Sequence, residues 1–399
     1  MSTAATLRGI GRQLDDATSL GCAVDELLAA RTEPPTVLAL GEPTHGIEAF
    51  PLLRNELLGL LVERGCRSIV LETDIFAAAV VDDYVAGGAG EIDTVLATGF
   101  SHGFGAVPGN RELVEWLREH NAGRAEQDRV RFYGFDAPLE TYSAPSPRQV
   151  LTTAAGYLPA ALRPKSTRDL DALLGDDADW TNQAAVFDAA VSIGDSERAR
   201  ALRIAADDLA STLRRAAPGL HLADPAGYAD AVAHARTAQG LLRYQAAMAI
   251  DAPDRVATLF SVRTEMMAEN LLAIVAEEQR RGPILVFAHN THLQRAHLPA
   301  GEWGSAGALV ELTLGERYVF VATDANPHSE PGTLQGALAE ATTRRALFPA
   351  TALRDALPPS TRPGEPIVRG HFPLNPAELD RTDAVIFIAD TDGKRVEYW

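Results

Sequence analysis

The sequence predicts an α/β protein with a layered core and a largely parallel β-sheet. Three observations indicate this fold class. Short runs rich in Val, Ile, Leu and Phe recur along the chain, most of these runs are apolar nearly throughout, and helical patterns separate most of them. Strands that are apolar on both faces are typical of parallel sheets covered by helices, and alternating strands and helices produce that arrangement.

Six runs have the length and the β-branched and aromatic content of strands. The predicted strands are 37–41, 67–71, 130–135, 284–288, 318–322 and 384–388. Leucines at helical spacing, such as Leu53, Leu57 and Leu61, predict amphipathic helices between them.

The middle of the chain, from about residue 143 to residue 281, lacks runs of strand character and is rich in alanine. Prolines such as Pro218 are expected to separate its helices. The predicted helices are 196–216, 227–250 and 255–281. We interpret 143–281 as a large helical insertion, part scaffold and part lid, that covers the cleft at the carboxyl ends of the strands. The whole chain, 1–399, is then a single domain.

Composition excludes several classes of partner. The chain has 399 residues, 46% of them hydrophobic, which is enough to bury a full core, and a net charge of −18, which repels nucleic acid and anionic membranes. No secretory signal and no apolar run of the roughly 20 residues that span a bilayer occurs. We expect a cytoplasmic protein that binds a small molecule and is a monomer or a weak homo-oligomer. The two cysteines, Cys22 and Cys66, are interpreted as small core residues rather than a disulfide framework.

Four predicted strands are followed at once by polar residues that can carry chemistry. The motifs are Gly-Glu-Pro-Thr-His-Gly at 41–46, Leu-Glu-Thr-Asp at 71–74, Tyr-Gly-Phe-Asp at 133–136 and Ala-His-Asn-Thr-His at 288–292. In parallel sheets, ligands bind beyond the carboxyl ends of the strands, where the connecting loops converge. The residues expected to line such a pocket are Glu42, His45, Glu72, Asp136, His289 and His292.

The Glu42-to-His45 spacing suits a histidine base that a carboxylate holds in one tautomer, although a purely structural turn would also use the flanking glycines. Glu72 is a charged residue at the end of a buried strand, which requires a partner or a purpose. A functional acid is the preferred interpretation, and a salt bridge to Arg54 in the following helix is the structural alternative.

His289 and His292 raise the question of a metal, because together with Glu42 and Glu72 they could supply three or four ligands. Their spacing is not the His-Glu-x-x-His pattern of a helix, and no cysteine ligand accompanies them. We therefore expect neither metal nor cofactor. The sequence has no Gly-x-Ser-x-Gly elbow, which would indicate a serine nucleophile. It also has no phosphate-binding loop and no Gly-x-Gly-x-x-Gly motif at a strand end, which would indicate a nucleotide cofactor.

Four residues are candidates for substrate binding: Asp136 and His292 from the expected pocket lining, and two further residues, His102 and Asn290. Asp136 could either cap a helix or orient a histidine, and both interpretations stay open. His102 lies in a glycine-rich loop that could reach the mouth of the pocket, and Asn290 follows His289 directly.

These motifs, together with Arg54, Met-Ala-Glu-Asn at 267–270 and the closing apolar strand, resemble the erythromycin esterase family from about residue 36 to residue 390. The resemblance implies hydrolysis of a macrolide lactone or another ester without a covalent nucleophile and without a required metal. A histidine that matches His45 activates water, and residues that match Glu42, Glu72, His289 and Arg54 surround it. The fold that the resemblance implies is an α/β core with a helical portion around a deep cleft.

The chain departs from the family pattern in parts of the expected cleft wall. Ser101-His102-Gly103-Phe104 stands where relatives often have tryptophans, and Arg263 is followed by Thr264 rather than Asp. We therefore expect a hydrolase for an ester or lactone bond in a natural-product or macrolide-like molecule, in antibiotic resistance or natural-product biosynthesis. In the hypothesised reaction, Arg54 or a protonated His289 stabilises the oxyanion.

Two alternatives to hydrolysis stay open. The same histidine and acids could drive acyl transfer, elimination or cyclisation of a biosynthetic intermediate if water is excluded. A haem-binding or other ligand-binding protein is the second alternative, although acids crowd the histidines and haem pockets are usually apolar.

Overall fold

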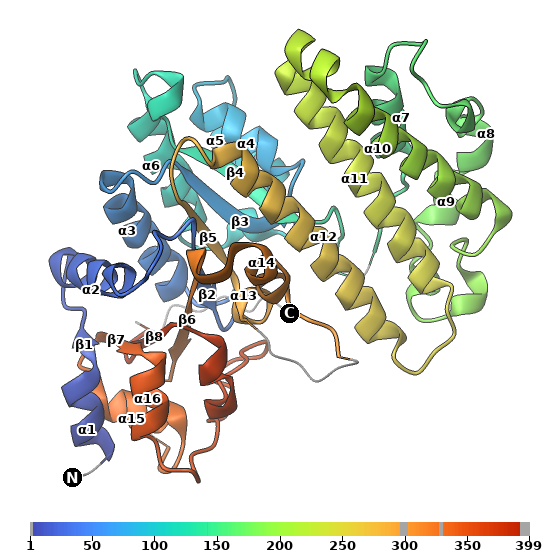
Figure 1. The fold of residues 1–399 in the computed structure, drawn as a ribbon. Coiled ribbons are helices and arrows are strands. Elements are labelled where there is room, and N and C mark those ends of the chain that lie inside the picture. The colour runs from blue at the N-terminus through green and yellow to red at the C-terminus, as the bar shows by residue number, and fades with distance from the viewer. Residues whose placement is uncertain (1–2, 142, 296–301, 327–329, 392–399) are drawn as a thin grey trace. The chain divides into compact units, whose positions relative to one another are not determined.

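The computed structural model describes residues 3–141, 143–295, 302–326 and 330–391. The chain forms two compact units. The first consists of Met1–Phe135 and Leu271–Trp399, and the second of Asp136–Asn270. The two units are described separately below, and Figure 1 shows their elements.

The first unit contains an eight-stranded sheet in the order β1-β7-β8-β6-β2-β5-β3-β4 (Figure 1). Its strands are β1 (Arg12–Gln13), β2 (Val37–Glu42), β3 (Ser68–Asp74), β4 (Arg131–Asp136), β5 (Ile284–His289), β6 (Tyr318–Ala325), β7 (Arg345–Pro349) and β8 (Ala384–Ile388). Strand β2 pairs in parallel with β5 and β6, β5 with β3, and β6 with β8. Strand β7 pairs antiparallel with β8 on one side and with the edge strand β1 on the other. The predicted α/β class with a largely parallel sheet is confirmed.

All six predicted strands occur, with ends that differ by a few residues. The two strands that sequence analysis missed, β1 and β7, are short and lie at one edge. Strand β1 has two residues at the edge of the sheet, and an edge strand pairs on one side only, so it needs no continuous apolar run. Strand β7 lies between β1 and β8, and its apolar run is short because Arg345 and Pro349 bound it. Central strand β2, in contrast, is buried at every position.

Helices α2, α3 and α6 pack on one face of this sheet. The predicted leucine stripe lies on α3, where Leu53, Leu57 and Leu61 are buried against the face that also presents Leu38 and Leu40. The helices of the first unit are α1 (Thr3–Ile10), α2 (Ala17–Ala29), α3 (Ala49–Glu63), α4 (Ala78–Val85), α5 (Ile92–Thr98), α6 (Asn110–Asn121), α13 (Asn290–Leu293), α14 (Ala306–Leu314), α15 (Leu334–Ala341) and α16 (Ala350–Ala356).

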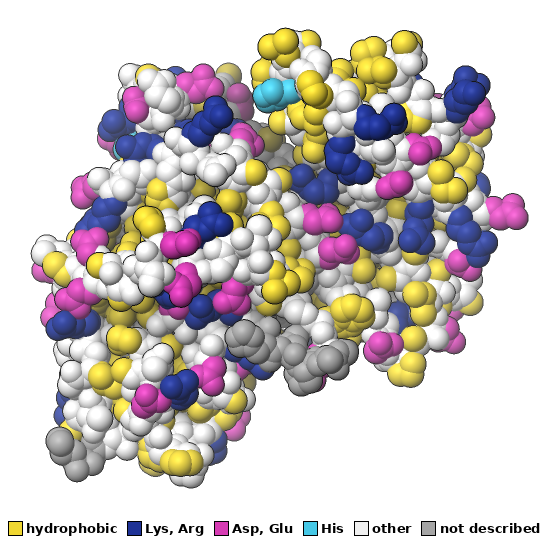
Figure 2. All heavy atoms as spheres, in the orientation of Figure 1, with side chains coloured by type: hydrophobic (Ala, Val, Ile, Leu, Met, Phe, Trp, Pro, Cys, Tyr) yellow, Lys and Arg dark blue, Asp and Glu magenta, His cyan; other side chains and the backbone are white. Residues whose placement is uncertain are grey.

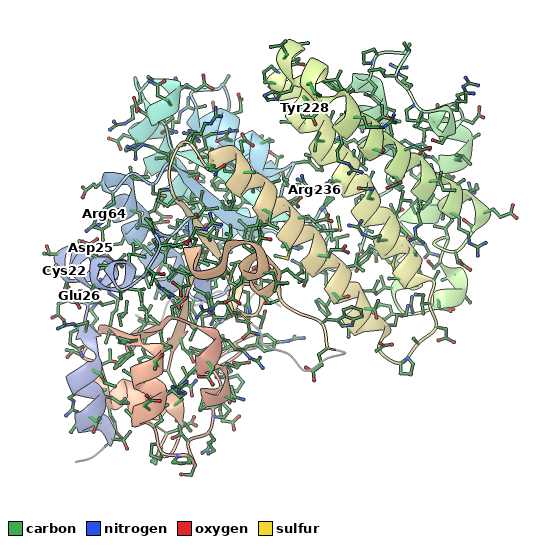
Figure 3. All side chains as sticks on the ribbon, viewed as in Figure 1. Cys22, Asp25, Glu26, Arg64, Tyr228 and Arg236 are labelled. Carbon is green, nitrogen blue, oxygen red and sulfur yellow. The ribbon has the colours of Figure 1, made fainter. Side chains whose placement is uncertain are left out.

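An exposed ion pair joins the first two long helices of this unit. Figure 3 shows Arg64, just past α3, pointing toward Asp25 of α2. The guanidinium donates to both carboxylate oxygens, at 2.6 and 2.8 Å. Such a bidentate pair adds directional order at the surface, although exposed pairs contribute at most about 1 kcal/mol.

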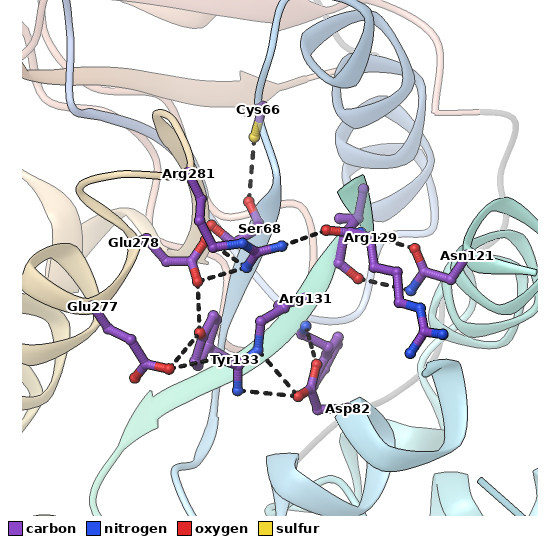
Figure 4. Close-up of polar contacts among 12 residues, drawn as sticks. Cys66, Ser68, Asp82, Asn121, Arg129, Arg131, Tyr133, Glu277, Glu278 and Arg281 are labelled. Atoms are coloured by element: carbon purple, nitrogen blue, oxygen red, sulfur yellow. Dashed lines mark hydrogen bonds and ion pairs between the residues drawn. The ribbon is translucent and has the colours of Figure 1, made fainter. Parts of the chain in front are cut away.

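A polar cluster ties the end of α12 (Arg255–Glu278) to edge strand β4 (Figure 4). The carboxylate of Glu278 is buried, and it accepts hydrogen bonds from Tyr133 at 2.8 Å and from Arg281 at 2.7 Å. Arg131 on β4 forms ion pairs with Asp82 and Glu277. Burial raises the pKa of the Tyr133 hydroxyl, so this group stays a hydrogen-bond donor to Glu278. Each buried charge has its partner, as stability requires.

The second unit is helical, as predicted for the middle of the chain. Helices α10 and α11 pack along each other, and α7 packs on α11. The helices of this unit, besides the first part of α12, are α7 (Arg148–Tyr157), α8 (Leu170–Leu174), α9 (Asp177–Trp180), α10 (Glu197–Ala223) and α11 (Pro225–Met248). The unit begins and ends somewhat earlier than the predicted insertion, and its function as a lid stays a prediction.

One expected helix end is wrong, because α10 continues through Pro218 for five more residues, to Ala223. Proline removes one backbone hydrogen bond and clashes with the preceding turn. A long helix can accommodate this near its end by a local bend, so that the helix continues.

Of the two cysteines expected in the core, one is buried and one is exposed. Cys66 is buried, and burial raises the pKa of its thiol to about 11, but Cys22 is exposed and so is not a core residue. On the face in Figure 2, acidic and basic side chains are interspersed. Among the described residues, no helix is both long enough and apolar enough to cross a membrane.

Candidate active site

The pairing of β2 with β5 places the first and the fourth polar motif side by side. In this parallel register Glu42 lies opposite His289. The close approach of the two strand ends requires glycine at position 41, because a Cβ atom there would lie 2.2 Å from Oδ1 of Asn290. Since β3 pairs with the other side of β5, Glu72 joins the same group.

Glu42 and His45 form a buried hydrogen-bonded pair. Nδ1 of His45 lies 2.8 Å from Oε1 of Glu42, and both side chains are almost fully buried. A carboxylate only accepts, so Nδ1 carries the proton and Nε2 presents its lone pair. Burial raises the pKa of Glu42, while the hydrogen bond and the charge of His45 oppose that rise. The pair thus holds a histidine with a basic nitrogen turned away from the acid.

Glu72 lies between two histidines. Its Oε1 is 3.9 Å from Nε2 of His45 and 3.2 Å from Nε2 of His292. Its Oε2 accepts the backbone N–H of His289 at 2.8 Å, which holds the carboxylate in place. A separation of 3.9 Å is too long for a direct hydrogen bond and suits a bridging water.

His289 has a hydrogen bond at each ring nitrogen. Nδ1 lies 2.8 Å from the hydroxyl of Thr291 and accepts the Thr291 backbone N–H at 3.2 Å. Nε2 lies 2.9 Å from the carbonyl oxygen of Pro43, which can only accept, so Nε2 carries the proton. Burial, and then the nearby His45, lower the pKa of His289 to about 3. These bonds describe a neutral imidazole that braces the loop carrying His45, and they speak against the protonated His289 hypothesised as oxyanion donor.

Arg54 is buried in α3 and makes no ion pair with Glu72, so that structural alternative is wrong. Its guanidinium donates to Asn55 through Nε and Nη2, to the carbonyl oxygen of Gly109 at 3.1 Å and to Asn110 at 2.8 Å. Burial lowers the pKa of Arg54 to about 10, against the opposing effect of the nearby Glu42. The side chain therefore stays charged, and its position is determined by three neutral partners.

A cavity of about 30 Å³ is lined by Arg54 and by the Glu42–His45 pair. Its other lining residues include Glu72, Phe104 and Asn110. Glu42 turns a second carboxylate oxygen, Oε2, toward buried surroundings where no hydrogen-bond partner is present among the described residues. Since about 10–15 Å³ of such space is enough for one water molecule, the cavity has room for water between this oxygen and Arg54.

Asn290 lines the strand ends, but its amide has a structural use. Nδ2 donates to the Thr323 carbonyl oxygen at 2.8 Å, and Oδ1 accepts the Thr323 backbone N–H at 3.4 Å. The hydroxyl of Thr323 donates in turn to the Gly41 carbonyl oxygen. These bonds tie β5, β6 and β2 together just below the site.

His102 lies one ring away from the base. Its ring is 5.3 Å from that of Phe104, which in turn is 4.7 Å from the ring of His45. The backbone of His102 has a φ of 55°, a left-handed conformation that is uncommon outside glycine. The assignment of His102 to substrate binding stays a prediction.

Asp136 belongs to the second unit, where its partner is Arg263. The guanidinium approaches both carboxylate oxygens, at 3.0 and 2.5 Å, and the Asp136 side chain is fully buried. Asp136 also accepts the backbone N–H of Ala137. This bidentate pair gives the acid a structural partner, and its assignment to substrate binding stays a prediction.

The structure therefore brings together Glu42, His45, Glu72, His289 and His292, with Arg54 behind them. Sequence analysis missed Thr291, which directs the tautomer of His289, and Asn110, which positions Arg54. A hydroxyl two residues after a histidine is a usable local signal, whereas nothing near Asn110 in the sequence links it to Arg54.

The described residues contain no group of three or more His, Cys, Asp or Glu side chains arranged to hold a metal ion. In the metal site considered from the sequence, His289 and His292 would both be ligands. His289 would have to exchange its hydrogen bond to Thr291 or to Pro43 for the metal.

Comparisons with known proteins give one family and three similar structures. The sequence profile described as erythromycin esterase matches residues 61–391. A search of curated proteins found no match.

The similar structures cover nearly the whole chain. A Bacillus cereus protein is 17% identical, with a TM-score of 0.71 over 97% of this chain and 96% of its own. A mutant of the erythromycin esterase EreC, in its open conformation, is 18% identical, with a TM-score of 0.68 over 96% and 95%. A succinoglycan biosynthesis protein is 14% identical, with a TM-score of 0.64 over 97% and 96%. At these identities the likeness shows a shared fold.

Proposed function

The chain belongs to the erythromycin esterase family, and on that premise we propose that it hydrolyses an ester or lactone bond in a macrolide-like or other natural-product molecule. The observation that carries the proposal is the buried Glu42–His45 pair, which leaves Nε2 of His45 directed toward Glu72 at 3.9 Å. This geometry suits a water held between a histidine base and a carboxylate.

In the proposed reaction, Nε2 of His45 removes a proton from this water while the hydroxide attacks the carbonyl carbon. Glu42 stabilises the imidazolium that forms, because its carboxylate accepts the hydrogen bond from Nδ1. Such general-base assistance is typically worth about 10²–10⁴-fold in rate. Collapse of the tetrahedral intermediate breaks the bond to the leaving oxygen, and His45 returns the proton to that alkoxide.

His292 is the residue that we assign to the developing oxyanion. Its side chain is 16% exposed, and Glu72 holds its Nε2 at 3.2 Å. In the proposed step the ring is the imidazolium, so Nε2–H donates to Glu72 and Nδ1–H donates to the oxyanion. A positioned donor to an oxyanion contributes about 3 kcal/mol to the lowering of the barrier. Neutral His289 has both ring nitrogens in hydrogen bonds and is not assigned to the oxyanion. Its bond to the Pro43 carbonyl oxygen instead stabilises the loop that carries His45.

Arg54 acts as a positioning residue in this scheme. Its guanidinium donates to neutral groups, and its charge lies across the cavity from the orphaned Glu42 oxygen. The positive charge opposes the effect of burial on the pKa of Glu42 and thereby favours the ionised acid.

The test is to incubate the purified protein with erythromycin and with p-nitrophenyl esters and to analyse the products by mass spectrometry. Hydrolysis adds the mass of one water to a lactone, and His45→Gln should abolish the conversion. His221→Gln, an exposed histidine of the second unit, is the matched control. An isomer or a dehydrated product would instead support the non-hydrolytic alternative, and conversion by His45→Gln at the wild-type rate would overturn the assignment of the base.

A further inference from the structure

A second cavity of about 280 Å³ lies in the first unit, and the reaction scheme above does not use it. We call it the C-terminal pocket, because much of its wall comes from the segment 363–375. Its apolar lining residues are Phe320, Phe372 and Leu374 with two prolines, and its polar lining residues include Asn290, Thr291, Gln294 and Glu378.

The C-terminal pocket shares two residues with the surroundings of His289. Thr291 lines the pocket, and its hydroxyl lies 2.8 Å from Nδ1 of His289. Phe372 also lines it, with its ring 5.3 Å from the His289 ring and perpendicular to it. The backbone N–H of Phe372 donates to the Pro43 carbonyl oxygen, the same oxygen that His289 approaches. The pocket and the loop that carries His45 therefore have a common wall.

A buried polar network holds the wall segment in place. Nε2 of His371 lies 2.9 Å from Oδ1 of Asp324, and neither side chain is exposed. The other oxygen of Asp324 accepts from the Leu374 backbone N–H and from Gln335, and Gln335 in turn accepts from the Gly364 backbone N–H. Both ends of the segment are thus fixed to β6 and α15, and the pocket is formed before any ligand binds.

The side chains that line the C-terminal pocket indicate which chemical class of ligand it can bind. The described residues that line the C-terminal pocket include no lysine or arginine that would favour a carboxylate or a phosphate. Glu378, the acid among them, already accepts the backbone N–H of Asn375. Aromatic and aliphatic surfaces with a few amides suit an uncharged, partly apolar group.

We propose that the C-terminal pocket is a substrate subsite that binds an uncharged, partly apolar group next to the scissile ester bond and so determines substrate size. Phe372 is 60% exposed although it lies against His289, which gives such a group an aromatic surface to cover. This inference rests on the proposed esterase function, since a subsite is defined by the bond that is cleaved beside it.

The test uses two ester series, p-nitrophenyl acetate, butyrate and octanoate for the acyl side, and methyl, butyl and octyl acetate for the alcohol side. Gln294→Trp fills the pocket, Phe372→Ala removes the shared wall, and Leu312→Ala is the control on exposed α14. In one of the two series, Gln294→Trp should lower the ratio of kcat/KM for the eight-carbon ester to kcat/KM for the shortest ester at least about tenfold. This is the effect expected when several methylene groups lose an apolar binding site.

Phe372→Ala should lower the same ratio, and Leu312→Ala should leave it at the wild-type value. Circular dichroism and thermal unfolding show whether each variant is folded, and Gln294→Trp decides the matter if Phe372→Ala is not. An unchanged ratio in both series for folded Gln294→Trp overturns the subsite.

A failure of the esterase function gives a different result, because the wild-type protein then hydrolyses no ester of either series. The pocket is tested in that case with 2-naphthol, a neutral aromatic alcohol, by fluorescence titration. Wild-type binding that weakens at least about tenfold in Gln294→Trp, but not in Leu312→Ala, supports the pocket as a ligand site. Absent binding, or equal binding by the wild type and Gln294→Trp, overturns it.

Discussion

Nδ1 of His45, in the loop that follows β2, is hydrogen-bonded at 2.8 Å to Oε1 of Glu42, the last residue of that strand. The acid that sets the tautomer of the base is thus only three residues away from it. Because the contact is local, it does not depend on the packing of distant segments, and the basic Nε2 is directed across to Glu72 on the next strand but one.

Replacement of His45 by asparagine is expected to remove the base and leave the fold intact. The turnover number should fall by about 10²–10⁴-fold, the usual contribution of a general base. Melting temperatures of the variant and the wild type should agree closely, because the amide is smaller and Glu42 can be hydrated through the adjoining cavity. A folded variant that keeps more than about a tenth of the activity would show that His45 is not the base.

Glu42→Gln tests the charge of the acid separately from its shape. The amide oxygen can still accept from Nδ1 of His45, so the tautomer is kept, but the imidazolium formed during the reaction loses its counter-charge. We expect kcat to fall by about 10²-fold or more with little change in KM, since the lost interaction strengthens only in the transition state. Steady-state kinetics measure both, and a change confined to KM would contradict the role.

Arg54→Lys keeps a positive charge but loses the planar fork that contacts Asn55, Gly109 and Asn110. Each buried acceptor that loses its donor costs about 1–3 kcal/mol, so the free energy of unfolding and kcat should fall together. Arg111→Lys, at an exposed position of α6, is the control and should change neither. Normal stability with a lower kcat would instead indicate direct contact between Arg54 and the substrate.

His289→Gln tests whether the His289 imidazole is neutral in the folded protein, and the quantity measured is the pH dependence of the free energy of unfolding. The pKa of His289 is about 3 in the folded protein and near 6.5 in the unfolded chain, so between these values only the unfolded chain binds the proton. Stability is therefore lost as the pH falls from about 6.5 toward 3, by at most about 1.4 kcal/mol per pH unit for this one group.

Glutamine can still donate to the Pro43 carbonyl but does not titrate. Urea unfolding of the variant between pH 6.5 and pH 4 should therefore show a shallower dependence than the wild type. Equal slopes for the two proteins would mean that His289 is not held neutral.

Dialysis against a chelator is expected to leave hydrolysis unchanged, because the proposed steps use proton transfer by His45 and hydrogen bonds made by Glu72 and His292, and no metal ion. Activity and elemental analysis are measured on the same sample before and after dialysis. Stoichiometric zinc, with activity that disappears on its removal and returns on its addition, would favour His289 and His292 as metal ligands.

The strand and helix periodicities of the sequence were sufficient to predict the class of fold, the six strands of the central sheet and the helical middle of the chain. They were sufficient because burial on both faces leaves a continuous apolar run, which is a local property. The paired residues Glu42 and His45 were predictable for the same reason, since the turn that joins them is short.

Polar residues at strand ends were harder to interpret, because a buried side chain takes its role from partners that are distant in the sequence. Asp136 pairs with Arg263, 127 residues away, and Asn290 bonds to the Thr323 backbone. Both were assigned to the substrate on local context alone, and the network of Asp324 with His371 drew no attention in the sequence.

The sequence by itself determined which residues can carry acid–base chemistry and that each of them follows a buried strand. Only the tertiary structure decided that β5 lies between β2 and β3, which brings Pro43 and His289, 246 residues apart, into hydrogen-bond contact. Strand order depends on which apolar faces pack together across the whole chain, and many orders satisfy the same local pattern. The protonation state of His289 follows from that order, because both its burial and its acceptor at Pro43 come from a neighbouring strand end.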